Sequence, residues 1–366
     1  MLFWLVVALA LVVLALAHLR FWTFVYRVLP EQDELRFAST KDGWRIAIAR
    51  RIPRRAPRLP PILLCHGLAA NRGNLDFGLA RYSVSLFLAE AGFDCFALDL
   101  RGHGGSVRDR KDAPRAWTFD TYLAHDIPTA LDEVRKATGS NDVLWVGHSQ
   151  GALLGLLAAS LFPDRISGVV AMAPPTHWHA QAELLRLMRF LPGGRGRNRI
   201  LARAFSPLAG YFHPAAAQLP LNTRNVEPRV LRQVMANVVE DVSAGVQAQF
   251  FRWARTDRFD SADGKLDYRE ALAKAKAPAL FLAGSKDLLA PPSAVRAGHD
   301  LWGGEKEFWV AGKAESNLQA DYGHSDLIFG RKAPEEVFTK VREWLLAHSR
   351  PRPAVLDAAP SVNQGR

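Results

Sequence analysis

The sequence Gly147-His148-Ser149-Gln150-Gly151 decides the fold of this chain. It follows the apolar run 142–146 and precedes the apolar segment 150–161, so the pattern predicts a sharp turn between a buried strand and a helix. Gly147 and Gly151 allow the strand and the helix to approach closely at this turn. The turn would hold Ser149 in a strained backbone conformation, with the free amides at the start of the helix beside its hydroxyl. This setting favours a nucleophilic serine over a serine that only caps the helix.

Short apolar strands alternate with helices on both sides of this turn. The expected strands are 62–65, 93–100, 142–146, 166–173, 279–283 and 305–310, and the expected helices are 81–91, 118–138, 150–161, 292–302 and 334–348. Strands without period-two alternation, separated by helices, are typical of a parallel sheet covered on both faces. Residues 34–52 add an antiparallel hairpin. We therefore predict an α/β fold with a mostly parallel, eight-stranded sheet.

The alternation stops at Pro174-Pro175 and resumes at residue 279. Between these points, helical patterns at 180–190 and 228–253 are joined by loops rich in Gly, Pro and Arg, which predicts a helical lid over one edge of the sheet. The expected organisation is a membrane anchor or signal segment at 1–19, a juxtamembrane linker at 20–33, the first part of the core at 34–175, the lid at 176–277, the second part of the core at 278–349 and a disordered tail at 350–366.

The segment Met1–Ala17 carries no charged side chain. As a helix it would be ~26 Å long, just enough to span the hydrocarbon of a bilayer. The aromatic residues that follow suit the interface of a membrane and favour a single-pass anchor; they are Phe21, Trp22, Phe24 and Tyr26. The alternative is a secretory signal peptide cleaved after Ala17, with a secreted product. Arg20 and Arg27 point weakly to a cytoplasmic domain, so the side of the membrane stays open.

The chain is basic, with a formal net charge of +11 over 366 residues. Arginines cluster at 50–58 and at 186–203, and no nucleic-acid motif accompanies them. The second cluster is interleaved with apolar residues, which fits either a surface facing a membrane or a solvated basic face. Cys65 and Cys95 are the only cysteines and lie in apolar runs, which excludes a disulfide scaffold. We expect no cofactor and no nucleic-acid partner, and the oligomeric state stays open.

A serine that transfers acyl groups needs two N–H donors for the oxyanion. The backbone amide of Gln150 is one candidate, and the amide of Leu68, in the sequence His66-Gly67-Leu68-Ala69 after the strand 62–65, is the other. Gly67 lets the backbone turn over the site, and His66 is expected to be structural.

The serine also needs a base and an orienting acid. Asp287 follows the strand 279–283, and His324 lies between the last strand and the last helix, in the chain order Ser, Asp, His. We therefore predict a Ser149–Asp287–His324 triad. Asp326 is the alternative acid, although its spacing of two residues from His324 suits the role poorly, and a structural His–Asp pair is the competing interpretation.

Two other motifs are interpreted as structural. The sequence 99–106 contains Gly102, Gly104 and Gly105, but no helix follows it directly and no Lys-Ser/Thr completes a phosphate-binding loop. His177-Trp178-His179 lacks the partners of a zinc site, so we expect it to contribute to packing of the lid and predict no metal.

The chain resembles the α/β-hydrolase superfamily and, within it, the acid lipase family of gastric and lysosomal lipases and steryl ester hydrolases. The matching stretches begin at His66, Gly147, Ala171, Gly284, Gly323 and Ala333, and the lid sequence from Gln249 to Tyr268 is also similar. The resemblance implies the triad and oxyanion amides named above, a lid over the site, and neutral lipid esters as substrates. Two features depart from the family: Ala69 stands where Leu is usual, and the Arg-rich middle of the lid has no counterpart.

These features predict a serine hydrolase that cleaves carboxylic esters, with lipid esters favoured, through an acyl-enzyme intermediate. A thioesterase or an acyltransferase would use the same residues. An amidase is less well supported, because no acidic cluster in the lid is suited to binding an amine. A catalytically silent, membrane-tethered binding protein is the alternative from another class.

Overall fold

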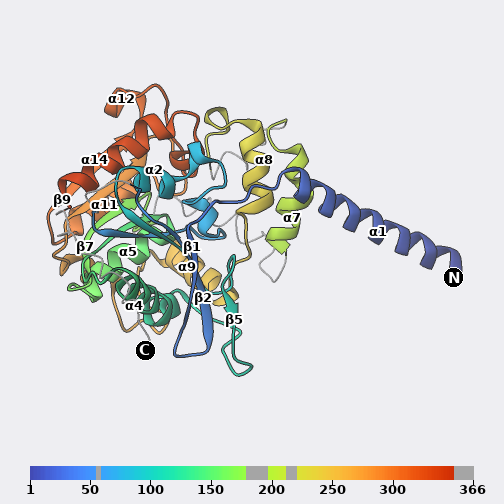
Figure 1. Ribbon diagram of the computed structural model, residues 1–366, viewed down its shortest axis with the longest axis horizontal. Coiled ribbons are helices and arrows are strands. Elements are labelled where there is room, and N and C mark those ends of the chain that lie inside the picture. The colour runs from blue at the N-terminus through green and yellow to red at the C-terminus, as the bar shows by residue number, and fades with distance from the viewer. Residues whose placement is uncertain (55–58, 179–196, 212–220, 350–366) are drawn as a thin grey trace, which may run out of the picture.

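The computed structural model describes residues 1–54, 59–178, 197–211 and 221–349 (Figure 1). A nine-stranded sheet forms the centre, in the order β1-β2-β4-β3-β6-β7-β8-β9, with β5 paired to β2. The pairs β1–β2, β2–β4 and β2–β5 are antiparallel, and all the others are parallel. The strands are β1 (Glu34–Ser39), β2 (Trp44–Arg51), β3 (Pro61–Cys65), β4 (Asp94–Asp99), β5 (Val107–Arg108), β6 (Val143–His148), β7 (Ile166–Met172), β8 (Ala279–Gly284) and β9 (Lys306–Ala311).

Helices cover both faces of this sheet. Every residue of β3, β4, β6 and β8 is buried, which requires cover on both sides. The helices of the core are α2 (Val84–Glu90), α3 (Phe119–Thr121), α4 (Ile127–Thr138), α5 (Gln150–Leu161), α11 (Pro292–Leu301), α12 (Lys313–Ser316), α13 (Asp326–Phe329) and α14 (Thr339–Ala347). The predicted α/β architecture is therefore confirmed.

The predicted core elements agree with the structure to within about two residues at most ends, with three differences. The prediction of eight strands misses β5, because a strand of two residues carries no hydrophobic pattern. The helix expected at 118–138 contains a π-helical turn at Tyr122–Asp126, and another π-helical turn at Pro334–Phe338 precedes α14. The helix expected to begin at Arg81 begins at Val84, after a short 3₁₀ turn at Ala80–Tyr82.

The region predicted as a lid is helical where it is described. It contains α7 (Arg197–Phe205), α8 (Pro228–Asn237), α9 (Ala244–Thr256) and α10 (Tyr268–Ala273), with 3₁₀ turns at Ser206–Leu208 and Thr223–Asn225. The prediction of a single helix at 228–253 is wrong. The helix α8 ends at Asn237, and the residues that follow it hydrogen-bond with the core. The segment 197–205, expected as a loop, is a helix. The helix expected at 180–190 and the tail at 350–366 lie outside the described residues.

At the N-terminus, α1 (Leu2–Val25) projects from the domain beside α7 and α8 (Figure 1). Within the described part of the chain, it is the one helix long and apolar enough to cross a membrane. None of its residues is buried, so the helix does not belong to the core.

The turn between β6 and α5 joins three backbone segments at very short range. A Cβ atom on Gly147 would overlap the backbone carbonyl of Gly151, and a Cβ atom on Gly151 would overlap the carbonyl of Cys65 at the end of β3. Neither position can hold a side chain without moving backbone. The two glycines therefore set the distance between the sheet and α5.

We predict that Gly151→Ala lowers the free energy of unfolding by about 3 kcal/mol, since the added methyl must displace the β3 backbone. Urea unfolding followed by circular dichroism measures this loss. Gly139→Ala is the control, because Gly139 also has a positive φ, 68°, but no atom lies within 4 Å of the position of an added Cβ. This substitution should lower the unfolding free energy by only about 1 kcal/mol. Equal effects at the two positions would contradict the prediction.

Candidate active site

Ser149 lies at the turn between β6 and α5, with φ 54° and ψ −115°. A positive φ is costly for a residue with a side chain, so the surrounding contacts must hold this conformation. The amide of Ser149 donates to the carbonyl of Met172 at the end of β7, at 2.8 Å. The strained conformation expected from the sequence is present.

The loop after β3 lies directly against this turn. A Cβ atom on Gly67 would be 3.4 Å from the Cβ of Ser149, so the backbone at 67–68 borders the serine. Gly67 donates its N–H to Oδ1 of the buried Asn74, at 3.0 Å. Among the described residues, no hydrogen-bond acceptor is found for the N–H groups of Leu68 and Gln150.

His66 fixes the shape of this loop. Its Nδ1–H donates to the carbonyl of Gly67 at 2.9 Å, and its Nε2 accepts the N–H of Leu100 at 3.2 Å. These partners require the neutral ring with the proton on Nδ1. Burial, together with the neighbouring His103, lowers the pKa of His66 to about 3. The structural role expected for His66 agrees with these contacts.

Asp287 and His324 meet at the carboxyl ends of β8 and β9. The Nδ1–H of His324 donates to Oδ2 of Asp287 at 2.7 Å. The other oxygen of Asp287 accepts the N–H groups of Leu289 and Ala290, both at 2.8 Å. Both side chains are buried, and three donors converge on one carboxylate. The pair leaves Nε2 as the ring nitrogen able to accept a proton.

Gly284 allows the loop that carries His324 to lie against the end of β8. A Cβ atom on Gly284 would be 2.6 Å from the carbonyl oxygen of Tyr322. The amide of Lys286 donates to this same carbonyl at 2.7 Å. Backbone contacts therefore fix the separation of the Asp287 loop from the His324 loop.

His148 links the serine turn to both neighbouring loops. Its Nε2 lies 3.1 Å from the backbone carbonyl of His324, and its Nδ1 lies 3.1 Å from Oδ1 of Asn74. Burial and the nearby His324 ring hold the pKa of His148 well below its ordinary value. A neutral ring carries one N–H and can donate to one of these oxygens at a time. The sequence pattern indicates no role for His148 or Asn74, because their partners lie far away in the chain.

Asp326 does not bond to the ring of His324. Its carboxylate accepts the N–H groups of Gly323 and Asn222 and the side-chain amide of Asn225, at 2.7–3.0 Å. Burial raises the pKa of Asp326. This carboxylate therefore holds the lid segment 222–225 against the loop that carries His324, and no sequence signal indicated this role.

The lid also bonds to the loop beside Ser149. The amide of Asn71 donates to the carbonyl of Val238 at 3.2 Å, and the amide of Glu240 donates to the carbonyl of Ala69 at 2.9 Å. Ala69 has φ 56°, a left-handed conformation like that of Ser149. These bonds explain why the helical pattern at 228–253 is interrupted. The predicted lid region is thus attached to the loops on both sides of the serine.

The other motifs have structural partners. Trp178 is buried against Trp253 and Phe259, as expected for packing of the lid, while His179 lies outside the described residues. Gly102 and Gly104 have positive φ, as a tight turn requires, and the amide of Gly105 donates to the buried Asp99 at 2.8 Å. Both cysteines are buried.

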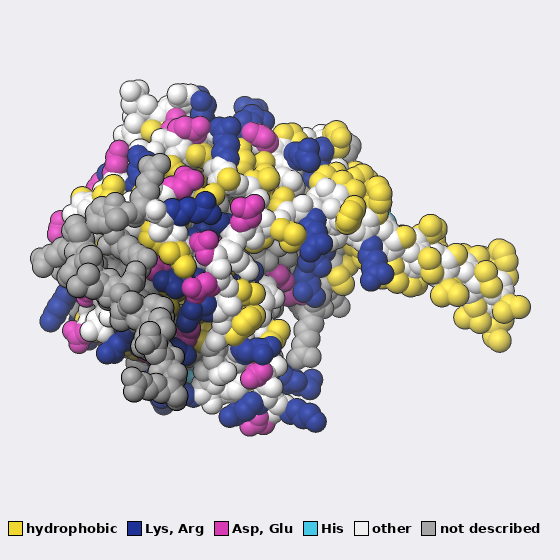
Figure 2. Space-filling view, viewed as in Figure 1, with side chains coloured by type: hydrophobic (Ala, Val, Ile, Leu, Met, Phe, Trp, Pro, Cys, Tyr) yellow, Lys and Arg dark blue, Asp and Glu magenta, His cyan; other side chains and the backbone are white. Residues whose placement is uncertain are grey.

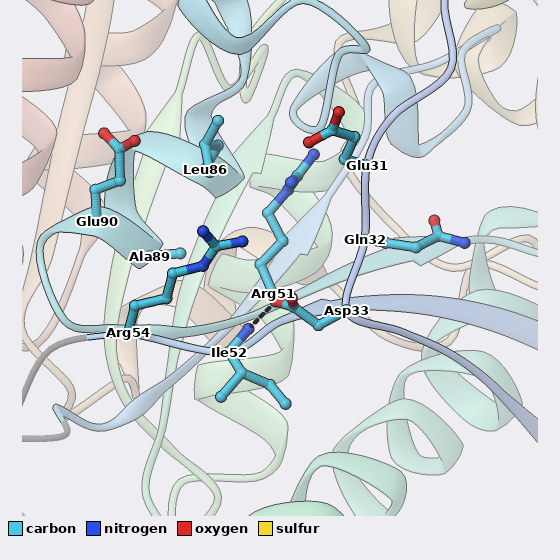
Figure 3. Close-up of a pocket in the computed structure, with 9 residues that line it drawn as sticks. All are labelled: Glu31, Gln32, Asp33, Arg51, Ile52, Arg54, Leu86, Ala89 and Glu90. Atoms are coloured by element: carbon cyan, nitrogen blue, oxygen red, sulfur yellow. Dashed lines mark hydrogen bonds between the residues drawn. The ribbon is translucent and has the colours of Figure 1, made fainter.

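A large cavity lies elsewhere, between residues 31–33, the end of β2 and α2 (Figure 3). Its volume is about 740 Å³, and its lining mixes acidic and basic side chains. The amide of Ile52 donates to the carboxylate of Asp33 at 2.7 Å, which joins two of the lining residues (Figure 3). None of the predicted site residues lines this cavity, so it contributes nothing to the chemistry at Ser149.

A known protein family matches most of this chain. The model of the α/β hydrolase fold family matches residues 60–330. The chain belongs to this family. Its match includes the serine turn, the lid region and the loops that carry Asp287 and His324.

Several characterised proteins are similar to this α/β hydrolase. Human lipase member K is 24% identical over 87% of both chains, and human lysosomal acid lipase/cholesteryl ester hydrolase is 23% identical over 88% of both. Human gastric triacylglycerol lipase is 31% identical, but over only 42% of each chain. Among solved structures, a thermophilic esterase from Thermogutta terrifontis has a TM-score of 0.56 at 19% identity, covering 86% of this chain and 99% of the esterase. The structural match shows the fold.

We predict that acid destabilises the protein through its buried histidines. The folded-state pKa of His66, about 3, lies below the unfolded value of about 6.5, so protons bind the unfolded chain preferentially as the pH falls below 6.5. Between pH 7.5 and 5.0 this residue alone should remove about 2 kcal/mol of unfolding free energy.

Urea unfolding of the wild type and of His66→Gln at the two pH values measures the unfolding free energies that test this prediction. The raised pKa values of Asp126 and Asp326 act in the opposite direction, and both aspartates are present in both proteins. The difference in unfolding free energy between the wild type and His66→Gln should therefore become smaller as the pH is lowered. A difference that does not change with pH would contradict the prediction.

Proposed function

We propose that this chain is a carboxylic ester hydrolase in which Ser149 is the nucleophile, His324 the base and Asp287 the residue that orients it. The bond of 2.7 Å between His324 and Asp287 is the observation that carries the proposal, because it directs Nε2 of the ring away from the carboxylate. The strained conformation of Ser149, next to two unbonded backbone amides, supports it. The related lipases are enzymes that, by name, act on lipid esters.

In the proposed reaction, Nε2 of His324 takes the proton of the Ser149 hydroxyl while the oxygen attacks the ester carbonyl carbon. The carbonyl oxygen becomes negatively charged and accepts hydrogen bonds from the amides of Leu68 and Gln150. Collapse of this intermediate breaks the bond to the alcohol, which leaves with the proton from His324. Water, deprotonated by His324, then releases the acid and restores Ser149. Asp287 stabilises the imidazolium in both steps.

Lipid esters are the proposed substrates. The described lid, part of the segment 176–277, is rich in apolar and aromatic side chains, and α1 would keep the domain at a membrane. A thioesterase or an acyltransferase would use the same residues, since the attack on the carbonyl is identical. A panel of p-nitrophenyl esters and acyl thioesters of matched chain length distinguishes these activities.

We also propose that α1 is retained as a single-pass anchor, with residues 20–33 as linker and 34–349 as the hydrolase with its lid. The proposal rests on the length and apolar character of the helix. Mass spectrometry of the protein purified from membranes tests it. A mature chain that begins at His18 would show instead that the segment is a cleaved signal peptide, and a protein washed from the membrane by carbonate would show that the helix does not span it.

We predict that Ser149→Ala abolishes labelling by a fluorophosphonate probe and lowers kcat for a short p-nitrophenyl ester by about 1000-fold or more, because the attacking oxygen is lost. Labelling is measured on gels and kcat by absorbance, with the melting temperature as a control for folding. Labelling that persists in this variant would contradict the assignment of the nucleophile.

We predict opposite outcomes for the two aspartates near His324. Asp287→Asn should lower kcat by about 10³–10⁴-fold with little change in unfolding free energy, since the ring loses its orienting charge. Asp326→Ala should lower the unfolding free energy by about 1–3 kcal/mol, because the buried amide of Gly323 and the partly buried amide of Asn222 lose their acceptor. If Asp326→Ala loses as much kcat as Asp287→Asn while remaining as stable as the wild type, Asp326 is the orienting acid.

A further inference from the structure

The end of α1 is attached to the lid rather than to the core. Leu19, Trp22 and Thr23 are partly covered and Tyr26 is buried, a spacing that places them on one face of the helix. This end of the helix packs against α7 and α8.

Three hydrogen bonds secure this attachment. Nε2 of His18 bonds to the carbonyl of Ala204 in α7, at 3.0 Å. The side-chain amide of Asn237, at the end of α8, donates to the carbonyl of Tyr26 at 2.8 Å and accepts the N–H of Val28 at 3.4 Å. These bonds to α7 and α8 therefore fix the direction in which α1 leaves the domain.

Beside this attachment, α7 and the turn after it expose a group of large apolar side chains. Phe205 is 55% exposed and Tyr211 is 68% exposed. We call the group the α7 surface; it consists of Ile200, Leu201, Phe205, Leu208 and Tyr211. Outside α1 and the linker that follows it, the other exposed large apolar residues of the described chain are a pair on β1, Leu35 and Phe37, and single residues on other segments. A group of this kind marks an interaction site.

Positive charge borders the α7 surface. Arg20 and Arg27 are exposed on α1 and just after it, Arg199 is exposed on α7, and Arg203 is partly buried on the same helix. Figure 2 shows Lys and Arg side chains beside hydrophobic ones where α1 meets the domain. The acidic partner of Arg199, Glu240, is buried. Apolar side chains within a basic rim suit the headgroup region of an anionic lipid leaflet.

The length of α1 places the α7 surface at this depth. Met1–Ala17 accounts for ~26 Å of helix, close to the thickness of the hydrocarbon, so residues from His18 onward reach the headgroups. These are the residues that contact α7 and α8. A second copy of the chain is a poorer partner, because two identical basic surfaces would repel each other.

We propose that the α7 surface docks on the anionic leaflet from which α1 emerges, so that the lid lies on the bilayer. The inference rests on the anchoring part of the proposed function and not on the chemistry at Ser149. Because the lid is bonded to the loops at 69–71 and at 321–326, docking holds the serine turn at a constant height above the bilayer. An ester could then pass from the leaflet to the site without crossing bulk water.

The experiment uses the full chain carrying Ser149→Ala, reconstituted in nanodiscs that contain phosphatidylglycerol and hold one protein molecule each. The native cysteines are fully buried, so a thiol-reactive NBD fluorophore labels an introduced cysteine selectively. Phe205→Cys and Leu208→Cys report on the α7 surface. Leu346→Cys, on α14 at the far side of the domain from α1 and 43% exposed, is the matched control (Figure 1).

We expect the label at 205 and 208 to shift to shorter wavelength and to be quenched several-fold more than at 346 by nitroxide-labelled lipid. Quenching should weaken when phosphatidylcholine replaces the anionic lipid. Equal quenching at all three positions overturns the proposal. A shift that is absent in these discs and occurs only in a parallel preparation with two molecules per disc overturns it too, because it indicates self-association. Since the protein carries Ser149→Ala, the outcome is independent of ester hydrolysis.

A second measurement connects docking to substrate access. Phe205→Ser with Leu208→Ser, in the catalytically intact chain, should lower hydrolysis of an ester embedded in anionic vesicles several-fold and leave hydrolysis of a soluble short-chain ester unchanged. An equal loss on both substrates would show a defect of folding or chemistry and would count against docking.

Discussion

The close approach of three backbone segments at the serine turn is the constraint on which the rest of the structure depends. The end of β6, the start of α5 and the end of β3 meet where Gly147 and Gly151 leave no room for a side chain. This approach forces Ser149 to a positive φ and places the 67–68 backbone beside it. The strain is offset by the buried packing of α5, ten of whose twelve residues are buried. The core thus holds Ser149 beside the N–H groups of Leu68 and Gln150, for which the described residues supply no acceptor.

The predicted lid region bonds to two loops of the core. Its break at 238–243 bonds to the loop that contains Ala69, and its segment 222–225 bonds to the loop that contains His324. These two loops approach the serine from opposite sides in the strand order, one after β3 and the other after β9. Motion of the lid would therefore change the distance between the proposed oxyanion amides and the proposed base. The same region also carries the attachment of α1, through hydrogen bonds with α7 and α8.

The buried polar groups near the site divide into two kinds. His66, Asn74 and His148 form neutral contacts that shape the loops, and burial keeps the pKa of both rings low. Asp287 accepts three N–H groups, one of them from His324. A charge that is fully hydrogen-bonded is tolerated in a buried site, and here it orients the ring. The neutral groups stabilise the shape of the site, and the carboxylate of Asp287 orients the ring that would accept a proton.

The sequence by itself determined the strands of the core and the serine turn, because hydrophobic periodicity and glycine spacing are local signals. It also determined the order of Ser149, Asp287 and His324, because the carboxyl ends of parallel strands meet at one edge of the sheet. Only the tertiary structure decided that Asp287 rather than Asp326 bonds to His324, that α8 ends at Asn237, and that α1 rests on α7. These features depend on contacts between residues far apart in the chain, such as Asn222 and Asp326, separated by 104 positions. Local pattern cannot encode such contacts, since each requires the rest of the fold to bring its two partners together.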